Sequence, residues 1–306
     1  MRFTIKQLEY FVATGETGSI KIAAEKIAIS QPSISSAISY LERELQVQLF
    51  VRHHAQGLSL TPIGKRIMRE AKQFLRQGEA IYSVANELQN SVRGNLSVGC
   101  MVTLAPMIAP QLAHGFSDLN PDVNLSIFDD SHEGLLARLH KVEIDAAISY
   151  NLLTPEDVVF EPLANLPPQV LLSVDHPLAK SEKLSLTNLI DEPMIFLDLP
   201  LSNNYFQSLF ENMGLRPRIH ARSSNPEVVK TMVANGYGFT IANVKPKSMM
   251  SLDGKKLTSI PLKGNHKPME IGVMTLKQDN KPKILTEFED YCRRVITETN
   301  IPGMST

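Results

Sequence analysis

The sequence IAAEKIAISQPSISSAISYLE, residues 22–42, decides how the N-terminal part of the chain folds. Its apolar residues recur at helical spacing on both sides of Ser30-Gln31-Pro32-Ser33. Ser30 suits the N-cap of a second helix, and Pro32 suits the first turn of that helix. Two short helices joined by a tight turn make a helix-turn-helix, whose second helix can enter the DNA major groove. An ordinary helical hairpin would show the same spacing, so the flanking sequence must decide.

The flanking sequence predicts a first helix on one side and a wing on the other. Residues 4–13 have a helical pattern that Gly15 and Gly18 are expected to end. After the second helix of the motif, expected at about 31–45, residues 48–52 and 58–60 alternate like two short strands around a polar tip. A hairpin in this place is the wing of a winged helix.

A long amphipathic helix is predicted next. Thr61 suits its N-cap and Pro62 its first position, and the helical pattern continues to Val92. A helix of this length favours pairing with a second helix, although packing on its own domain is the alternative. Its apolar stripe consists of Ile63, Ile67, Ala71, Phe74, Leu75, Ile81, Val84, Ala85 and Leu88.

Beyond Arg93-Gly94-Asn95 the pattern changes to alternating strands and helices. Strands at 96–100, 123–128 and 144–149 alternate with helices at 105–119 and 132–140, which predicts a parallel sheet with covering helices. A second set of strands and helices follows between 170 and 261, and a strand at 269–276 and a helix at 282–299 close the chain. We therefore predict two α/β lobes joined by crossings at 163–168 and 265–268.

The N-terminal run resembles the DNA-binding domain of LysR-type transcriptional regulators almost position by position. The matching residues are AAEKIAISQPSISSAISYLERELQVQLFVR, at 23–52, and LSLTPIG, at 58–64. A looser resemblance continues through NPDVNLSIFDD, EIDAAISY, EPLANLPPQVLLSVDHPLA and VVKTMVANGYGFTIA. The resemblance implies a linker helix that pairs with its copy in a second subunit and a two-lobed effector domain like that of periplasmic solute-binding proteins. It also implies a homodimer or a homotetramer built from two dimers.

Composition fits an intracellular DNA-binding protein. From Met1 to Arg76 there are eleven Lys and Arg against six acidic residues, about +5, whereas the whole chain has a net charge of -1. A basic N-terminal module on a mildly acidic body is typical of a polyanion-binding site. The apolar runs are too short to span a bilayer, no signal peptide is expected, and two cysteines make no disulfide framework. We expect a cytoplasmic protein without cofactor or metal.

The DNA-binding candidates lie on the second helix of the motif and on the wing. Gln can pair with adenine through two hydrogen bonds, and Ser is less selective. The family commonly has Arg at position 36, so Ser36 indicates less guanine readout here. Arg52 matches the LF-x-R motif of the family and is the best candidate for a phosphate contact, while the lysines have solvated surface as an equal alternative. The candidates are Gln31, Pro32, Ser33, Ser35, Ser36, Arg52, His53 and Lys65.

The effector candidates lie where strands end and helices begin. Ligands of open α/β sheets gather at these corners, and helix N-termini favour anions such as carboxylates. The resembled family uses hydroxyl residues there. Helix capping alone is the alternative explanation, and the acidic pair Asp129 and Asp130 would oppose an anion or favour an amine. The candidates are Cys100, Met101, Thr103, His132, Ser149, Tyr150, Ser202 and Asn203.

The prediction is an all-α winged helix-turn-helix at 1–61, a linker helix at 62–93 and an α/β effector domain at 94–306. Lobe I is expected to hold 94–164 and 268–306, and lobe II 165–267. The expected function is transcriptional regulation through promoter DNA, a small carboxylate effector and RNA polymerase. A solute-binding protein and a metabolite-processing enzyme of the same two-lobed fold are the alternatives. The effector, the operator and the choice between activation and repression stay open.

Overall fold

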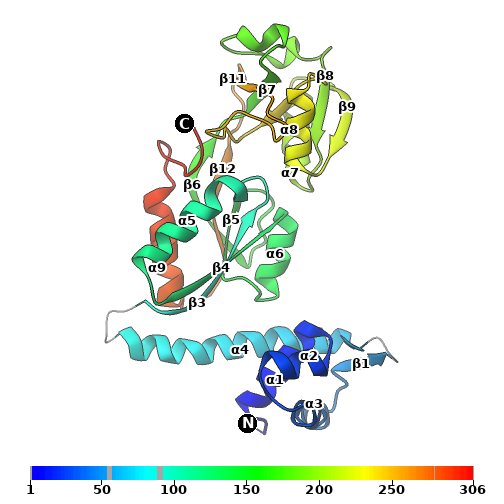
Figure 1. Cartoon of the computed structure of the whole chain (residues 1–306), viewed down its shortest axis with the longest axis vertical. Helices are drawn as coiled ribbons and strands as arrows, with labels where there is room; N and C mark the ends of the chain where they lie inside the picture. The colour runs from blue at the N-terminus through cyan, green and yellow to red at the C-terminus, as the bar shows by residue number, and fades with distance from the viewer. Residues whose placement is uncertain (1, 54–56, 88–91, 279, 306) are drawn as a thin grey trace. The chain divides into compact units, whose positions relative to one another are not determined.

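The computed structural model describes residues 2–53, 57–87, 92–278 and 280–305, and it divides into two compact units. One unit comprises Met1–Ser91 with His140–Val142, and the other comprises Val92–Leu139 with Glu143–Thr306. Short helices, a hairpin and a long helix form the N-terminal unit, and sheets covered by helices form the other (Figure 1). The predicted fold class is therefore confirmed.

The N-terminal unit contains the predicted winged helix-turn-helix. Thr4 and Ser19 cap the first two helices, and Ser30 accepts a hydrogen bond from the Ser33 backbone at the start of the third. The first helix does not end at Gly15. It continues to Gly18, which has φ 64° and closes it. The elements are α1 (Ile5–Thr17), α2 (Ile20–Lys26), α3 (Gln31–Leu45), β1 (Phe50–His53), β2 (Gly57–Leu60) and α4 (Pro62–Glu87).

One apolar core holds these elements together. Phe11 of α1, Ile34 and Leu41 of α3, and Leu49 before the wing are fully buried and belong to one cluster. The first half of α4 joins the same cluster through side chains that include Met68, Ala71 and Phe74. The beginning of the linker helix therefore packs on its own domain. The part of the predicted helix at 88–91 lies outside the described residues.

Lobe I is a five-stranded sheet in the order β4-β3-β5-β12-β6. The strands β3, β4 and β5 run parallel, as the alternation of strands and helices predicts, whereas β12 is antiparallel to both β5 and β6. Helices α5 and α9 cover one face of this sheet, and α6 covers the other (Figure 1). The elements are β3 (Gly94–Met101), α5 (Ala105–Leu119), β4 (Val123–Asp130), α6 (His132–His140), β5 (Ala146–Tyr150), β6 (Val158–Leu166), β12 (Met269–Leu276) and α9 (Lys283–Val295).

Lobe II has the sheet β10-β7-β11 and the parallel pair β8-β9. A bridge between Met194 and Phe239 links the two groups of strands, and α8 packs on them through Val229 and Val233. The elements are β7 (Gln169–Ser173), η1 (Pro177–Lys180), η2 (Leu186–Asn188), β8 (Pro193–Leu197), α7 (Ser202–Glu211), β9 (Arg218–Ser223), α8 (Pro226–Ala234), β10 (Thr240–Ala242) and β11 (Leu257–Pro261).

Two findings differ from the sequence prediction. The strand β6 was not predicted, because Pro162 interrupts its pattern; it lies at the sheet edge, where the register against β12 shifts between Ile271 and Gly272. The last residues do not stay with lobe I alone. Met304 forms a bridge with Pro246 of lobe II, and the Lys247 backbone donates to the Gly303 carbonyl.

Candidate DNA interface and effector cavity

The exposed side of α3 carries the predicted base-reading residues. Gln31, Pro32, Ser33 and Ser36 are exposed, whereas Ile34, Ala37, Ile38 and Leu41 face the core. The hydroxyl of Ser33 lies 2.8 Å from the Ser30 hydroxyl, and Ser35 is half-buried. Gln31 and Ser36 are therefore predicted residues of this helix with exposed polar side chains.

Two residues of the same helix were absent from the predicted set. Ser39 and Arg43 are exposed and continue the face of Pro32 and Ser36 at helical spacing. The Arg43 guanidinium lies 5.3 Å from the centre of the Tyr40 ring, which orients it. The spacing alone could have identified this pair.

The wing presents Arg52 and His53 to solvent. Both residues are exposed on β1, and Arg52 lies opposite Leu58 of β2. His53 Nε2 lies 2.7 Å from the Ser59 hydroxyl. The tip at 54–56 is outside the described residues. Lys65, the remaining candidate, is exposed in the first turn of α4.

Backbone contacts fix the wing against the helices. The Glu42 carboxylate accepts hydrogen bonds from the backbone N–H groups of Leu49 and Phe50, at 2.8 and 3.2 Å. The Thr61 hydroxyl donates to the Gln48 carbonyl and accepts from the Gly64 backbone, at 2.7 and 2.9 Å. Because these bonds join α3, β1 and α4, the wing and the recognition helix, α3, form one surface.

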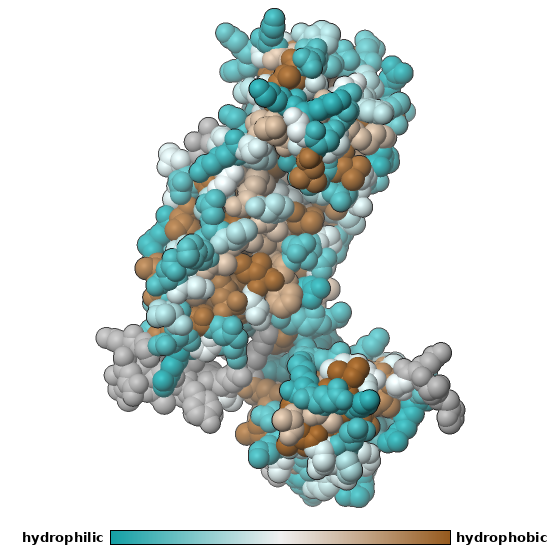
Figure 2. Space-filling view, in the orientation of Figure 1, coloured by the Kyte–Doolittle hydropathy of each residue, from teal (hydrophilic) through white to brown (hydrophobic). Residues whose placement is uncertain are grey.

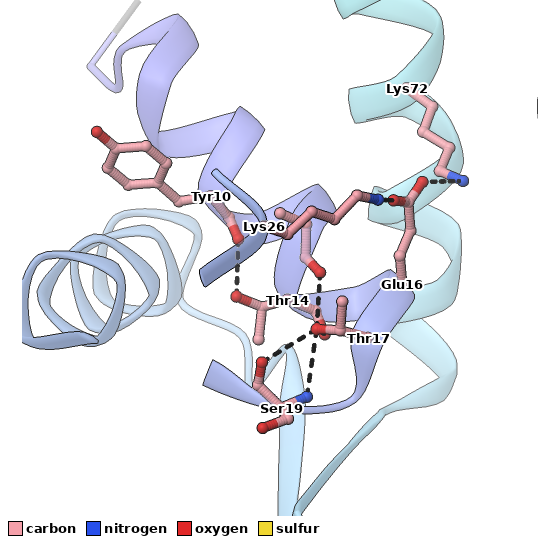
Figure 3. Close-up of polar contacts among 8 residues, drawn as sticks. Tyr10, Thr14, Glu16, Thr17, Ser19, Lys26 and Lys72 are labelled. Atoms are coloured by element: carbon pink, nitrogen blue, oxygen red, sulfur yellow. Dashed lines mark hydrogen bonds and ion pairs between the residues drawn. The ribbon is translucent and has the colours of Figure 1, made fainter. Parts of the chain in front are cut away.

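A charged cluster joins α1, α2 and α4 (Figure 3). The Glu16 carboxylate lies 3.0 Å from the Lys26 ammonium and 3.0 Å from the Lys72 ammonium. Burial by itself would raise the pKa of Glu16, but the hydrogen bonds to the two lysines outweigh it and hold the pKa below its usual 4.5. Nearby, the Thr17 hydroxyl bonds to the Ala13 and Ser19 carbonyls, which closes the turn between the first two helices.

In the other unit, two predicted corners line one small cavity between the lobes. Thr103 follows β3 of lobe I and Ser202 begins α7 of lobe II, and both line a cavity of about 30 Å³. The Thr103 hydroxyl lies 3.0 Å from the Tyr150 hydroxyl, and burial raises the pKa of Tyr150. The complete lining is Thr103, Tyr150, Leu197, Leu199, Ser202, Phe206, Ala242, Asn243, Val244 and Met269.

The start of α7 is a helix terminus with an unusual preceding residue. Leu201 has φ 59°, a conformation that is strained for leucine, and none of the described side chains caps the helix there. The first two backbone N–H groups are occupied, since Ser202 donates to the Pro200 carbonyl and Asn203 to the Leu199 carbonyl. The Asn203 side chain turns away to the Asp198 carboxylate, at 3.0 Å. Ser202 is therefore the polar side chain at this terminus that lines the cavity.

The structure places four other effector candidates in the core of lobe I. Cys100 and Met101 are buried in the apolar cluster, and burial next to Asp129 raises the pKa of the Cys100 thiol to about 12. His132 and Ser149 are fully buried, with His132 Nδ1 2.9 Å from the Ser149 hydroxyl. Burial lowers the pKa of His132, so its imidazole is neutral at pH 7. These four side chains support the corners from inside the lobe.

The acidic pair divides between the two faces of β4. The Asp130 carboxylate accepts a hydrogen bond from Arg138 Nε at 3.0 Å, on the side of α6. Asp129 lines a separate pocket of about 590 Å³, which α5 and the beginning of α8 also form. Neither residue lines the small cavity. The acidic pair is therefore no obstacle to an anion between Thr103 and Ser202.

The hydropathy of the surface, groups of possible metal ligands and possible membrane spans complete the description of the structure. Figure 2 shows hydrophilic side chains mixed with smaller hydrophobic patches on one face of the molecule. Within 2–53, 57–87, 92–278 and 280–305 there is no group of three or more His, Cys, Asp or Glu able to hold a metal ion. None of the helices among these residues is long and apolar enough to cross a bilayer.

An exposed recognition helix with a wing, a long following helix and two α/β lobes around a cavity define a ligand-responsive DNA-binding regulator. Comparison with known families agrees: residues 5–65 match the bacterial regulatory helix-turn-helix of the lysR family, and residues 89–297 match the LysR substrate binding domain. The chain belongs to the LysR family of transcriptional regulators. It is a regulator rather than an enzyme.

Individual relatives support the same assignment over nearly the whole chain. The uncharacterized HTH-type transcriptional regulator YvbU of Bacillus subtilis is 30% identical, over 90% of this chain and 93% of that protein. HinK, a LysR family regulator from Pseudomonas aeruginosa, has 36% identity and a TM-score of 0.65, with 96% and 99% of the two chains covered. A full-length OxyR variant from Pseudomonas aeruginosa shares the fold, with a TM-score of 0.79 at 24% identity and coverage of 95% and 98%.

Proposed function

We propose that this regulator binds a promoter through α3 and the wing, and that a small carboxylate held between its lobes controls the response. The observation that carries the effector proposal is the pairing of Thr103 from one lobe with Ser202 from the other around one cavity. Among the residues that the structure describes, the buried Ser202 hydroxyl has no hydrogen-bond partner, and such a group favours a polar ligand. A ligand that touches both lobes can bias their arrangement, and hence the DNA-bound state.

The regulator is proposed to act as a homodimer or homotetramer in the cytoplasm, with RNA polymerase as its partner at the promoter. A dimer holds two recognition helices at a fixed half-site spacing. The described part of α4 is 26 residues long, and its first half already packs on the DNA-binding core. Its second half is the part of the helix that we assign to pairing.

Two substitutions separate base reading from phosphate binding. Gln31→Ala should weaken binding to the cognate duplex alone by roughly 1–3 kcal/mol. Arg52→Ala should weaken binding to every duplex and lower the salt dependence by about one unit of slope. Titrations on the DNA upstream of neighbouring genes and on a scrambled duplex measure both effects. An equal loss on both duplexes for Gln31→Ala would exclude its base-reading role.

The effector proposal is tested by calorimetry on the full-length protein after a screen of small carboxylates and amines. Thr103→Val and Ser202→Ala should each cost roughly 1–3 kcal/mol of carboxylate affinity and leave operator binding without effector intact. Unchanged affinity in both variants would place the site elsewhere. An amine as the binding class would instead favour the larger pocket, which Asp129 and Glu227 line.

A further inference from the structure

The small cavity contains an unpredicted polar residue, Asn243. Its side chain is 5% exposed, and it lines the cavity together with Ser202, which is 3% exposed. Asn243 Oδ1 and Ser202 Oγ are both buried atoms without a hydrogen-bond partner in the part of the chain that the structure describes. Two such atoms in one cavity point to a ligand that pairs with both, because buried polar groups are otherwise costly.

The hydrogen bonds of Asn243 fix which end of its amide meets the ligand. Its Nδ2 donates to the Leu166 carbonyl at 2.8 Å and lies 3.1 Å from the Tyr205 hydroxyl oxygen. A backbone carbonyl only accepts, so the nitrogen must face Leu166 and a flipped amide is excluded. The Tyr205 hydroxyl donates to the Lys267 carbonyl at 2.8 Å, so its oxygen is available to accept from Nδ2. The remaining atom, Oδ1, is therefore a fixed acceptor.

A fixed acceptor selects for a donor. The other polar groups of the lining are the hydroxyls of Thr103, Tyr150 and Ser202, which can donate or accept, and the remaining residues are apolar. None of the lining residues, all of them within the described chain, is charged. A carboxylate oxygen can pair with the hydroxyls but would repel Oδ1. An O–H or N–H group on the ligand is required opposite Asn243.

We infer that Asn243 determines the specificity of the cavity and selects small carboxylates that also carry a hydroxyl or amino group. This inference rests on the proposed effector function and names its chemical class. The carboxylate would meet the Ser202 and Thr103 hydroxyls, and the hydroxyl or amino group would donate to Asn243. A cavity of about 30 Å³ has room for only about two water molecules, so the lobes must separate slightly to admit even a small hydroxy or amino acid.

The position of Asn243 also joins the ligand to both crossings between the lobes. β6 runs through Leu166, so the first crossing is only 167–168 rather than the predicted 163–168, and Lys267 lies in the second crossing just before β12. Asn243 bonds to the residue that precedes the first crossing and, through Tyr205, to the second crossing. A ligand that pairs with Asn243 Oδ1 therefore contacts a side chain that is hydrogen-bonded at both connections between the lobes.

The test uses matched acids that differ by one donor. Lactate is compared with propionate, glycolate with acetate, and alanine with propionate, by calorimetric titration of the full-length protein. The donor-bearing acid should bind roughly 10- to 100-fold more tightly than its partner, the expected effect of leaving a buried acceptor unpaired. Concentrations up to about 50 mM are sufficient, because they fill even a site with a Kd of order 1 mM.

Two variants assign the discrimination to the Asn243 acceptor. Asn243→Leu, of similar size, should reduce the ratio of the two affinities to nearly one. Tyr205→Phe removes a hydroxyl that contacts Asn243 from outside the lining, so it should keep the ratio while changing the link to Lys267. The wild-type ratio is decisive by itself should Asn243→Leu fail to fold.

The outcomes distinguish this inference from the proposed function. Equal affinity for both members of each pair would overturn the role of Asn243 and leave a carboxylate effector standing. A ratio that survives Asn243→Leu would also overturn it, because the donor would then be read elsewhere. Binding of neither member of any pair would overturn the inference and the proposed carboxylate effector together.

Discussion

Substitution of Glu16 by glutamine should loosen the DNA-binding unit at its joint with the linker helix. The carboxylate pairs with Lys26, which is 57% exposed, and with Lys72, which is only 12% exposed. The exposed pair of Glu16 with Lys26 contributes about 0.2–1 kcal/mol to stability. The pair with Lys72 contributes more, because without Glu16 this lysine would remain partly buried and lose the carboxylate. We expect a total loss of about 1–2 kcal/mol, or a factor of roughly 5–30 in the local opening equilibrium.

Hydrogen exchange followed by mass spectrometry on the full-length protein measures this opening directly. Peptides from α1 and the first half of α4 should exchange faster in Glu16→Gln, and added salt should reduce the difference. Glu9→Gln is the matched control, since Glu9 is exposed on the same helix and the charge change is the same. The control should change exchange little.

The pH dependence gives a second, independent check. The pKa of Glu16 is lower in the folded protein than its usual 4.5, so the stabilisation is complete above about pH 4.5. It is lost as the pH falls through the lower folded-state pKa, and the difference between wild type and Glu16→Gln should shrink there. Equal exchange in the two variants at neutral pH and low salt would refute the reasoning.

Four further substitutions test other parts of the structure. Ile81→Glu, in the second half of α4 that we assign to pairing, should yield monomers by light scattering, with circular dichroism reporting whether the DNA-binding core survives; an unchanged oligomer would place the interface elsewhere. The unit that contains the two lobes should lose stability as the pH falls below 6.5, by up to about 1.4 kcal/mol per pH unit, because burial lowers the pKa of His132. In calorimetric unfolding at several pH values, His132→Gln should weaken this dependence of stability on pH. In Gly64→Ala the new Cβ would lie 2.2 Å from the Leu49 carbonyl oxygen, so we expect a loss of about 1–3 kcal/mol. Gly78→Ala, whose new Cβ would meet no atom within 4 Å in the described part of the chain, should instead gain about 0.5–1 kcal/mol; thermal melts in which Gly64→Ala is the more stable variant would contradict both expectations.

The parts of the fold that follow from local pattern could be predicted from the sequence. The helix-turn-helix has its apolar spacing, Ser30 and Pro32 within a few residues, so its boundaries were predicted closely. The strand β6 was missed because Pro162 lies inside it, and its pairing with β12 across the sheet, which places Pro162 opposite Gly272, makes it a strand. Its signal lies 110 residues away in the chain, where no local pattern can show it.

The candidate effector site likewise contains residues that the sequence could predict and residues that it could not. Thr103 and Ser202, which line the small cavity, were predicted because a strand end followed by a helix start is visible in the sequence. It also selected His132, whose side chain turns inward to Ser149; this rotamer depends on the packing inside the lobe. Asn243 follows a three-residue strand without any periodic signal, and its partners lie 77 and 38 residues away.

The C-terminal residues close a loop between the lobes. Gly303 has φ 74° and lies so near Met107 of α5 that an added Cβ would be 2.5 Å from the Met107 carbonyl, while its own carbonyl accepts from Lys247. Met304 is buried, and the Ser305 backbone donates to the Lys245 carbonyl. A side chain added at Gly303 would therefore disturb contacts that residues 303–305 make with both lobes. We expect substitutions at this glycine to appear among mutants with altered induction.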